Sequence, residues 1–357
     1  MSRGSQHLRS LTSLRFIAAF LVVAHHADPM VYPPSLQPLA VLRYGYLGVT
    51  FFFVLSGFVL VWSARDDDTA RGFYRRRFAR VWPLHALTFC LAAGLAAAGL
   101  VDVYGPAWAA PINLALLQAW VPDSEVILSF NDVSWSLSAE AFFYAVFPVL
   151  VILGRRRGWP VMLVAGVIWL VVGGVLAQAL GSPGYVSTFP AYRVGEFVVG
   201  MALGLAARRA TPARQALVPT SLASASVAVS FVALLAFNRF SGGWFADHAW
   251  AATLVMLPSV ALVVMAFAAR DAAGREGLLT HPVMVRLGLW SFALYMVHNI
   301  VLRLARPWTS EHGWTVFIAI AVAVALSGLL YEAFERPVEK RLRGRARPAV
   351  QLEPAGK

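Results

Sequence analysis

The sequence has little charge, few acidic residues and a single cysteine. Of its 357 residues only 13% are charged and 59% are hydrophobic, whereas soluble domains carry about 25% charged residues. Cys90 stands alone in an apolar run, which excludes an intrachain disulfide and suggests neither a thiolate site nor a metal site. The net charge of +12 arises from basic residues in short clusters between apolar runs. That placement is typical of membrane topology and argues against a nucleic-acid partner.

Long uncharged runs predict an all-α membrane protein with about ten transmembrane helices. The expected spans are 12–28, 45–63, 81–101, 135–153, 159–180, 191–207, 216–237, 247–269, 286–305 and 314–334. The first run is not a signal peptide, because no small-x-small cleavage site follows it and many more spans come after. We expect one transmembrane domain over residues 1–345, a disordered cytoplasmic tail over 346–357, and no internal repeat.

The basic clusters alternate along the chain. With the N-terminus inside, the inner loops hold the clusters around Arg9, 65–80, 155–157, 208–214, 270–275 and 336–347, whereas the outer segments hold Arg239 and Arg306. Lysine and arginine concentrate on the cytoplasmic side of membrane proteins. Both termini are therefore predicted to be cytoplasmic, in a multi-pass plasma-membrane protein. The long outer connection 102–134 is expected to be re-entrant or interfacial, beside a cavity.

The first apolar run, "SLRFIAAFLVVAHH", has ionisable residues at both ends. Arg15 and His26 are eleven residues apart, which places them on the same face of a helix about 16 Å apart, with Ala19 and Val22 between them, whereas His25 is rotated by about 80°. Ionisable groups at membrane depth are costly and are usually functional. The alternative is structural: Arg15 reaches the headgroups and the histidines cap the helix at the outer surface.

An arginine cluster, "FYRRRFARVWP", begins the third expected span. Arg76, Arg77 and Arg80 fall on about one turn of helix. Guanidinium groups pair with phosphates in a bidentate manner, so the cluster could clamp a phosphorylated ligand. An anchor that obeys the positive-inside rule would need the same residue types. The residue pattern alone leaves both interpretations open.

Other ionisable residues lie in the outer half of the expected spans. Glu140 follows Trp135 in an aromatic segment, at about the depth of His26, and a carboxylate commonly orients a histidine and raises its basicity. The alternative is a structural partner for an arginine. Residues of the same layer form a candidate substrate-binding set with Trp135: Arg193, Glu196, Tyr295 and His298. Taken alone, His298 is explained equally well as a structural histidine whose hydrogen bonds are satisfied within the helix bundle. Glu335 is expected to pair with an inner arginine.

These motifs resemble the acyltransferase-3 family, integral-membrane enzymes that acylate cell-surface glycans, lipids and glycosylated natural products. The resemblance covers most of the chain and rests on motifs that occur in the family's order: "LRFIAAFLVVAHH", "GVTFFFVLSGF", "RRRFARVWP", "WSLSAEAFFYAVFP", "RVGEFVVG", "LGLWSFALYMVH" and "FERP". The resemblance implies an O-acyltransferase with acyl-CoA, acetyl-CoA above all, as co-substrate, membrane lipid around it, and no permanently bound cofactor.

Residue by residue, the family's first-helix arginine and catalytic histidine match Arg15 and His26. Its arginine motif matches Arg76, Arg77 and Arg80, and its fourth-span glutamate matches Glu140. Ala141 stands where a second glutamate often follows, and His25 occupies a position that is often aromatic, so a catalytic part for His25 stays open.

The resemblance leads to one expected mechanism and one runner-up. CoA phosphates would bind the arginines, the pantetheine arm would extend along the first helix, and His26, oriented by Glu140, would act as base on a sugar hydroxyl of a glycan or a macrolide-like product. A transient acyl-histidine is the variant. The runner-up is a glycan or lipid transporter without acyl-transfer chemistry, whose intramembrane polar residues line a substrate path.

Overall fold

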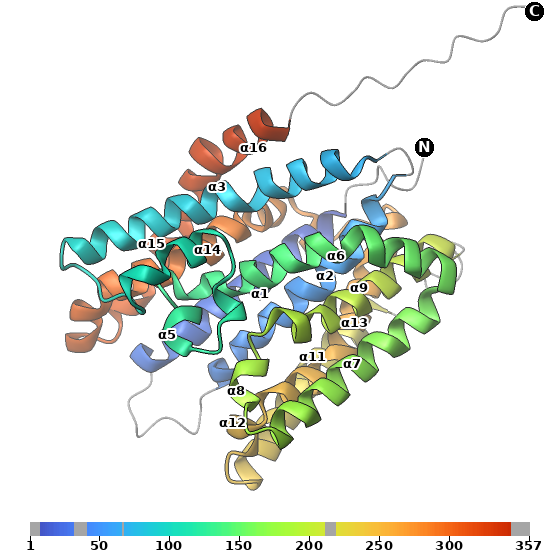
Figure 1. Cartoon of the computed structure of the whole chain (residues 1–357), viewed down its shortest axis with the longest axis horizontal. Helices are drawn as coiled ribbons and strands as arrows, with labels where there is room; N and C mark the ends of the chain where they lie inside the picture. The colour runs from blue at the N-terminus through green and yellow to red at the C-terminus, as the bar shows by residue number, and fades with distance from the viewer. Residues whose placement is uncertain (1–7, 32–40, 66–67, 211–218, 344–357) are drawn as a thin grey trace, which may run out of the picture.

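The computed structural model describes residues 8–31, 41–65, 68–210 and 219–343, so the tail 346–357 lies outside the described residues. Within those ranges the chain is a helical bundle, with one isolated β-bridge between Tyr104 and Ser129. The long helices run roughly side by side along one axis (Figure 1). Their bounds are α1 Arg9–Val31, α2 Gly48–Ser63, α3 Ala70–Ala97, α6 Trp135–Arg157, α7 Trp159–Ala179, α9 Pro190–Arg209, α11 Thr220–Phe240, α13 Ala249–Ala272, α14 Pro282–Glu311 and α15 Thr315–Leu330.

Each of the ten expected spans is a helix, which confirms the all-α membrane fold. Among the described residues, nine helices are long and apolar enough to cross a membrane by length and composition. The tenth, α9, is not in that set, because Arg193, Glu196, Arg208 and Arg209 interrupt its apolar sequence. Helix α3 begins eleven residues earlier than the expected span 81–101, because the arginine-rich segment is itself helical and continues directly into the apolar run.

The basic residues gather at one end of the bundle. Contacts show that these helix ends lie together: Arg9 at the start of α1 donates to the backbone of Thr280 just before α14, Arg75 of α3 contacts the end of α16 (Arg336–Arg343), and Arg208 of α9 contacts the end of α2. The opposite end carries Arg43 and Arg303 besides the expected Arg239 and Arg306. The positive charge of Arg303 is balanced by Asp132 at 2.7 Å, so the first end of the bundle remains the more positively charged one.

Two kinds of helix surface separate the centre from the periphery. Helices α7 and α11 leave large apolar side chains exposed, for example Ile168 at 55% and Val229 at 66%. Such surfaces suit lipid as a solvent. At the centre, α2 packs against α9 so closely that a Cβ on Gly200 would lie 1.9 Å from the carbonyl oxygen of Val54. Small residues allow this close approach of helices within membranes.

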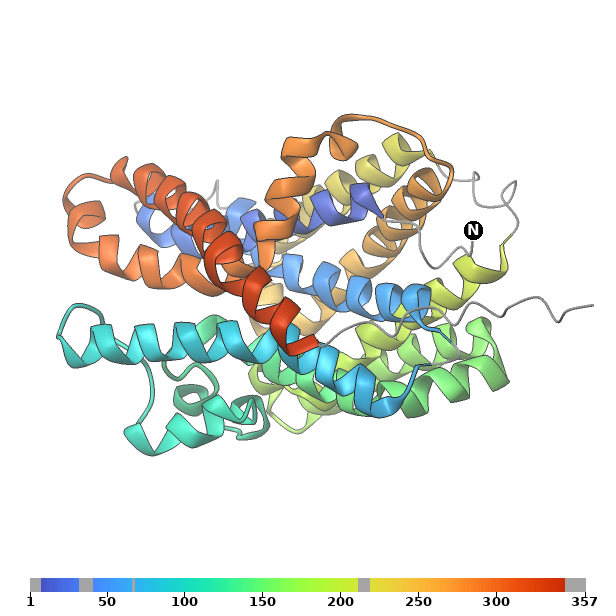
Figure 2. The same cartoon turned by 90° about the horizontal axis from the view of Figure 1, so that it is seen from above.

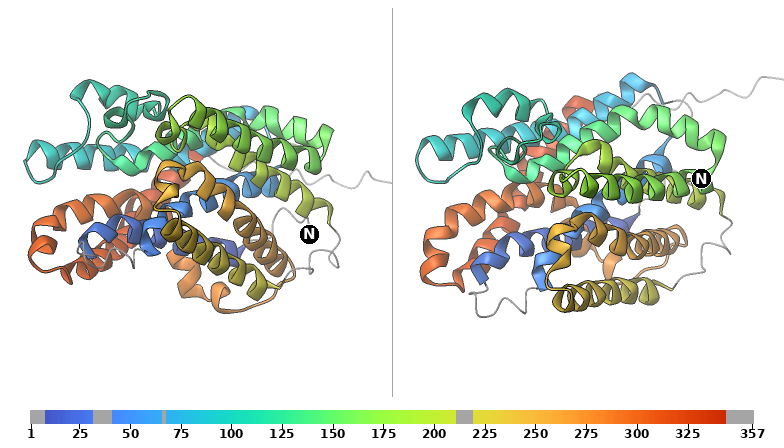
Figure 3. Two further views of the ribbon diagram at one scale, coloured as in Figure 1. Left: turned by 90° about the horizontal axis from the view of Figure 1, so that it is seen from below. Right: turned by 60° about the horizontal axis from the view of Figure 1, so that its bottom comes forward.

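The remaining helices arrange themselves around this centre. Figures 2 and 3 show α14 and α15 beside α1, and α3 crossed by α16. The last expected span continues from α15 through a π-helical turn, Tyr331–Glu335, into α16. A π-turn widens a helix locally and often marks a functional site. Here it directs Glu335 toward α3, where it meets Arg80.

The outer connection 102–134 folds into short helical turns. They are η4 Ala107–Ala109, α4 Ala110–Leu114, η5 Gln118–Trp120, α5 Ser124–Ile127 and η6 Asp132–Ser134. Buried amides supply the hydrogen bonds that this irregular backbone needs: Asn113 donates to Ser129, Gln118 to Ser134, and Asn131 to the carbonyl of Met296 on α14. The connection is thereby attached to α14 near His298.

Candidate active site

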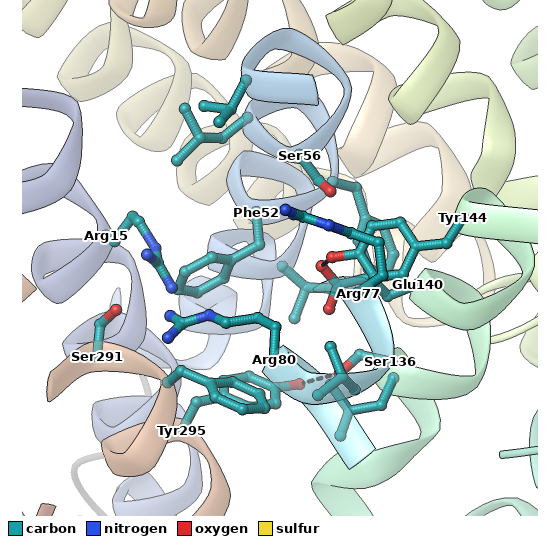
Figure 4. Close-up of a pocket in the computed structure, with 17 residues that line it drawn as sticks. Arg15, Phe52, Ser56, Arg77, Arg80, Ser136, Glu140, Tyr144, Ser291 and Tyr295 are labelled. Carbon is teal, nitrogen blue, oxygen red and sulfur yellow. Dashed lines mark hydrogen bonds between the residues drawn. The ribbon is translucent and has the colours of Figure 1, made fainter. Parts of the chain in front are cut away.

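A cavity of about 160 Å³ opens between five helices (Figure 4). Its polar lining comes from Arg15 of α1, Arg77 and Arg80 of α3, Glu140 and Tyr144 of α6, and serines 56, 136 and 291. Its apolar lining comes mainly from α2, which contributes Val49, Phe52, Phe53, Leu55 and Val59. Residues that are far apart in the sequence thus surround one cavity inside the membrane domain.

Arg15 and Arg77 project into this cavity without a carboxylate partner. Neither forms an ion pair with any acidic side chain that the structure describes, and the Nε atom of Arg77 is buried with no hydrogen-bond partner. The guanidinium of Arg77 lies over the rings of Phe73 and Tyr144, with Cζ 5.9 and 5.7 Å from their centroids. An unpaired cation within a membrane domain is costly unless an anion joins it. The pair can therefore receive an anionic ligand.

The other two arginines of the motif are already paired. Arg80 contacts Glu335 at 2.5 Å and Glu339 at 3.3 Å, which confirms the expected pairing of Glu335 with an inner arginine. Its guanidinium still faces the cavity beside Arg15 (Figure 4). Arg76 binds Asp68 at 2.7 Å and does not line the cavity. Of the three expected phosphate ligands in the cluster, the structure thus brings Arg77 and Arg80 to the cavity and leaves Arg76 outside it.

Glu140 lies in the arginine cavity rather than beside His26. It accepts a hydrogen bond from the hydroxyl of Tyr144, one helical turn further along α6, and Figure 4 shows the two side chains beside Arg77. Glu140 and His26 are both described by the structure, and no hydrogen bond joins them. The expected orienting pair is therefore replaced by a carboxylate that shares the cavity with three arginines. Tyr144 was missed in the sequence, although its spacing of four from Glu140 permits this contact.

His26 contacts another histidine. Its Nδ1 lies 2.9 Å from the carbonyl oxygen of Val22 and 3.3 Å from Nε2 of His298, and the ring centroids of the two histidines are 5.0 Å apart. His298 is fully buried, and its Nδ1 lies 2.8 Å from the carbonyl of Tyr295. His26 itself is half-buried. The structure thus joins two residues that the sequence analysis had assigned to different roles.

Tyr295 connects the histidines to the cavity. It lines the cavity, exchanges a 2.8 Å hydrogen bond with Ser136, and lies 6.0 Å from the ring of His298. Ala19 and Val22, which the sequence places between Arg15 and His26 on the same face of α1, are buried in the helix interface. Between the arginines and the histidines, the cavity is lined by residues of α2 and α14, such as Phe52 and Tyr295, and His26 and His298 are not part of its lining.

His25 points elsewhere. Its ring packs on Tyr46 at 5.7 Å, and its Cβ lies against Gly45 in the turn η3 Val41–Leu47. The helical phase derived from the sequence therefore separates the two histidines correctly. His26 faces α14, and His25 faces η3.

The remaining candidates form a buried ion pair outside the cavity. Arg193 and Glu196 approach to 3.0 Å, with side chains 6% and 0% exposed, and Arg193 lies over the rings of Phe53 at 4.9 Å and Trp135 at 5.9 Å. Neither residue of the pair lines the cavity, nor does Trp135. Through these contacts the pair joins α9 to α2 and α6 on the side away from the cavity. No group of three His, Cys, Asp or Glu side chains that could hold a metal ion occurs among the described residues.

Comparison with known proteins gave one family and several relatives. The family model described as "Acyltransferase domain" matches residues 8–332. Acyltransferase MdmB of Streptomyces mycarofaciens is 34% identical, over 98% of this chain and 96% of its own length. The exopolysaccharide production protein ExoZ of Rhizobium meliloti is 26% identical over 85% and 92%. The putative peptidoglycan O-acetyltransferase YrhL of Bacillus subtilis is 24% identical over 95% of this chain and 56% of its own length. No solved structure matches the chain.

Proposed function

The chain belongs to the acyltransferase-3 family of membrane acyltransferases, and from this premise we propose that it moves an acyl group, acetyl in the first instance, from acyl-CoA to a sugar hydroxyl. The single observation that carries the donor assignment is the cavity with Arg15 and Arg77, two guanidinium groups that form no direct ion pair with a described carboxylate. An acyl-CoA molecule carries phosphates at one end and a thioester at the other. Guanidinium groups bind phosphates through paired, charge-assisted hydrogen bonds.

The position of this cavity suits a donor that enters from the arginine-rich end of the bundle. We place that end in the cytoplasm, where positive loops concentrate and acyl-CoA is made. Arg77 is seven residues from the start of α3, about 10 Å along the helix axis. A phosphate held there would leave the pantetheine arm to extend past Phe52 and Tyr295 toward the histidines. Arg15 and His26 are eleven residues apart, about 16 Å along α1 and comparable with the length of that arm.

The proposed reaction needs one base and one leaving group. His26 takes the proton of the acceptor hydroxyl, the hydroxyl oxygen attacks the thioester carbonyl, and the C–S bond breaks. The proton then passes from His26 to the CoA thiolate, so that an ester and CoA–SH leave and the enzyme is unchanged. General-base catalysis of this kind contributes roughly 10²–10⁴ in rate. Transfer through an acyl-histidine would use the same ring nitrogen as nucleophile.

The acceptor is proposed to be a sugar hydroxyl, either on an exported glycan or on a glycosylated natural product such as a macrolide. The names of two relatives support the first option, since ExoZ is an exopolysaccharide production protein and YrhL a putative peptidoglycan O-acetyltransferase. MdmB, which matches over nearly its whole length, is described only as an acyltransferase. Both acceptor classes present the same chemical group to the base.

The test is a titration followed by a transfer assay on the purified protein in lipid nanodiscs. CoA, dephospho-CoA and pantetheine are titrated in turn, and affinity is expected to fall in that order as phosphates are removed. Acetyl-CoA is then supplied with a glycan or a macrolide, and mass spectrometry looks for the gain of one acetyl group. Equal affinity for CoA and pantetheine would contradict the arginine assignment. Uptake of the glycan into proteoliposomes without acylation would favour a transporter.

A further inference from the structure

The contacts of the two histidines fix which ring nitrogens carry protons. Nδ1 of His298 faces two carbonyl oxygens, of Leu294 at 3.1 Å and Tyr295 at 2.8 Å. Carbonyl oxygens only accept hydrogen bonds, so this Nδ1 must carry the proton. A charged imidazolium in a fully buried position is costly without an anionic partner in contact. His298 is therefore neutral, and its Nε2 carries a lone pair.

The same reasoning applies to His26. Its Nδ1 lies 2.9 Å from the carbonyl of Val22, so this nitrogen also carries a proton, and 3.3 Å away it meets the lone pair of His298 Nε2. The opposite assignment would point a lone pair of His26 at the carbonyl oxygen. With Nδ1 protonated, the free lone pair of His26 is on Nε2. This is the atom that can take a proton or attack an acyl group.

We infer that His298 is a positioning residue: by accepting from Nδ1–H of His26, it holds the ring in the tautomer that keeps Nε2 free as the base. The inference rests on the proposed function, and it gives His298 the part that the aspartate has in a Ser-His-Asp triad. It differs from the expectation in the sequence, which gave that part to Glu140 and placed His298 among the substrate-binding residues.

The carbonyl of Val22 does not by itself explain the arrangement. It lies four residues before His26 within α1, so it also accepts the backbone amide bond of the helix. Nε2 of His298 takes no part in a backbone hydrogen bond of a helix. Its lone pair can stabilise the positive charge that develops on His26 when Nε2 of His26 takes the proton. Acceptors aimed in advance at developing charge are a principal source of catalytic power.

The segment of α14 that carries His298 is held in place by several hydrogen bonds. The adjacent Asn299 donates to both oxygens of Asp132 at 2.7 Å, and Arg303 binds the same carboxylate at 2.7 Å. Asn131 donates to the carbonyl of Met296 at 2.9 Å. These bonds attach α14 to the outer connection on both sides of His298. A residue that positions another by hydrogen bonding needs such a fixed support.

Two substitutions of His298 separate positioning from mere packing. In His298→Gln the amide oxygen reaches the place of Nε2 and can still accept from His26, whereas in His298→Asn the shorter amide replaces only the Nδ1 end. We expect kcat for acyl transfer to fall about 10–100-fold in His298→Asn, the effect of one hydrogen bond to a developing charge. His298→Gln should recover most of that loss, and KM for acyl-CoA should stay within about twofold in both.

A second measurement determines the tautomers of the two histidines and does not depend on an activity assay. Nitrogen-15 spectra of histidine-labelled protein, assigned by the His26→Ala and His298→Asn variants, report which ring nitrogen of each histidine bears a proton. We expect Nδ1–H on both rings in the wild type, with Nε2 of His26 deprotonated. An Nε2–H tautomer of His26 in the wild type would overturn the inference, as would equal kcat values for the Asn and Gln variants. If the wild type transfers no acyl group while the spectra show the expected tautomers, the proposed function fails and the positioning contact stands.

Discussion

The arginine cavity and the histidine pair are both polar regions buried in the same membrane domain, yet they are built on opposite principles. In the cavity, Arg15 and Arg77 keep their charges without a carboxylate partner. In the histidine pair, each Nδ1 has an acceptor, and neither ring needs a charge. An uncompensated charge in a low-dielectric region stores electrostatic energy that an anion can release. A satisfied neutral pair stores none and fixes geometry instead.

This difference suggests a division of labour between binding and chemistry. Substitutions at the arginines should change how tightly the acyl donor binds, and substitutions at the histidines should change how fast the bound donor reacts. Tyr295 borders both regions, since it lines the cavity and lies 6.0 Å from the ring of His298. Single substitutions in either region should therefore separate the effect on binding from the effect on rate.

The largest effect is expected for His26→Ala. Removal of the base should lower kcat by roughly 10²–10⁴-fold, while the dissociation constant for CoA should change by less than about twofold because the arginines remain. Steady-state kinetics and a CoA titration on the same preparation measure both. His312→Ala, at an exposed histidine beyond the end of α14, is the matched control. A loss of CoA binding as large as the loss of kcat would show that the two regions do not act separately.

Arg77→Ala is expected to weaken the binding of CoA rather than to lower kcat. This change removes a guanidinium without a carboxylate partner, so CoA should bind about 10–100-fold more weakly, as when one charged hydrogen bond is lost. Arg77→Lys should restore only part of the affinity, because an ammonium group cannot form the bidentate contact. Arg76→Ala, one residue away but paired with Asp68 outside the cavity, should stay close to the wild type. Equal losses at Arg76 and Arg77 would indicate that general positive charge, rather than the cavity, attracts the donor.

Much of the architecture was accessible from the sequence, because apolar periodicity and the placement of arginines are local signals. The ten helices, the separation of His25 from His26 by helical phase, and the pairing of Glu335 with an arginine all follow from such signals. The partners of Glu140 and His26 do not. The sequence predicts a similar depth for Glu140 and His26, but such a prediction leaves open which way a side chain points around the bundle, and the structure places Glu140 in the cavity with Arg15. The contact of His26 with His298 joins residues 272 positions apart, and only the packing of α1 against α14 brings it about.

The smallest effect is expected for Glu335→Gln. This change should raise the affinity for CoA and lower the thermal stability of the protein. The substitution removes the charge of the nearer of the two carboxylates that pair with Arg80, at 2.5 Å, while it keeps a side chain of the same shape. Arg80, left with Glu339 at 3.3 Å, then adds part of its charge to that of Arg15 and Arg77, so CoA should bind about 3–10-fold more tightly, the effect of roughly 1 kcal/mol of added attraction at the effective dielectric of a protein. The same change weakens the contact between α3 and the π-turn, so the midpoint of thermal unfolding should fall.

A matched control lies in the same turn. Glu332 is more exposed than Glu335 and pairs with Arg286 and Arg336, neither of which lines the cavity. Glu332→Gln should therefore leave CoA affinity unchanged. If Glu335→Gln weakens CoA binding instead, Arg80 needs its carboxylate in order to be held in place, and its part in the cavity is structural. If it tightens binding, the carboxylate of Glu335 limits the positive charge of an anion site, and the contrast between a charged binding region and a neutral catalytic one extends to all three arginines of the cavity.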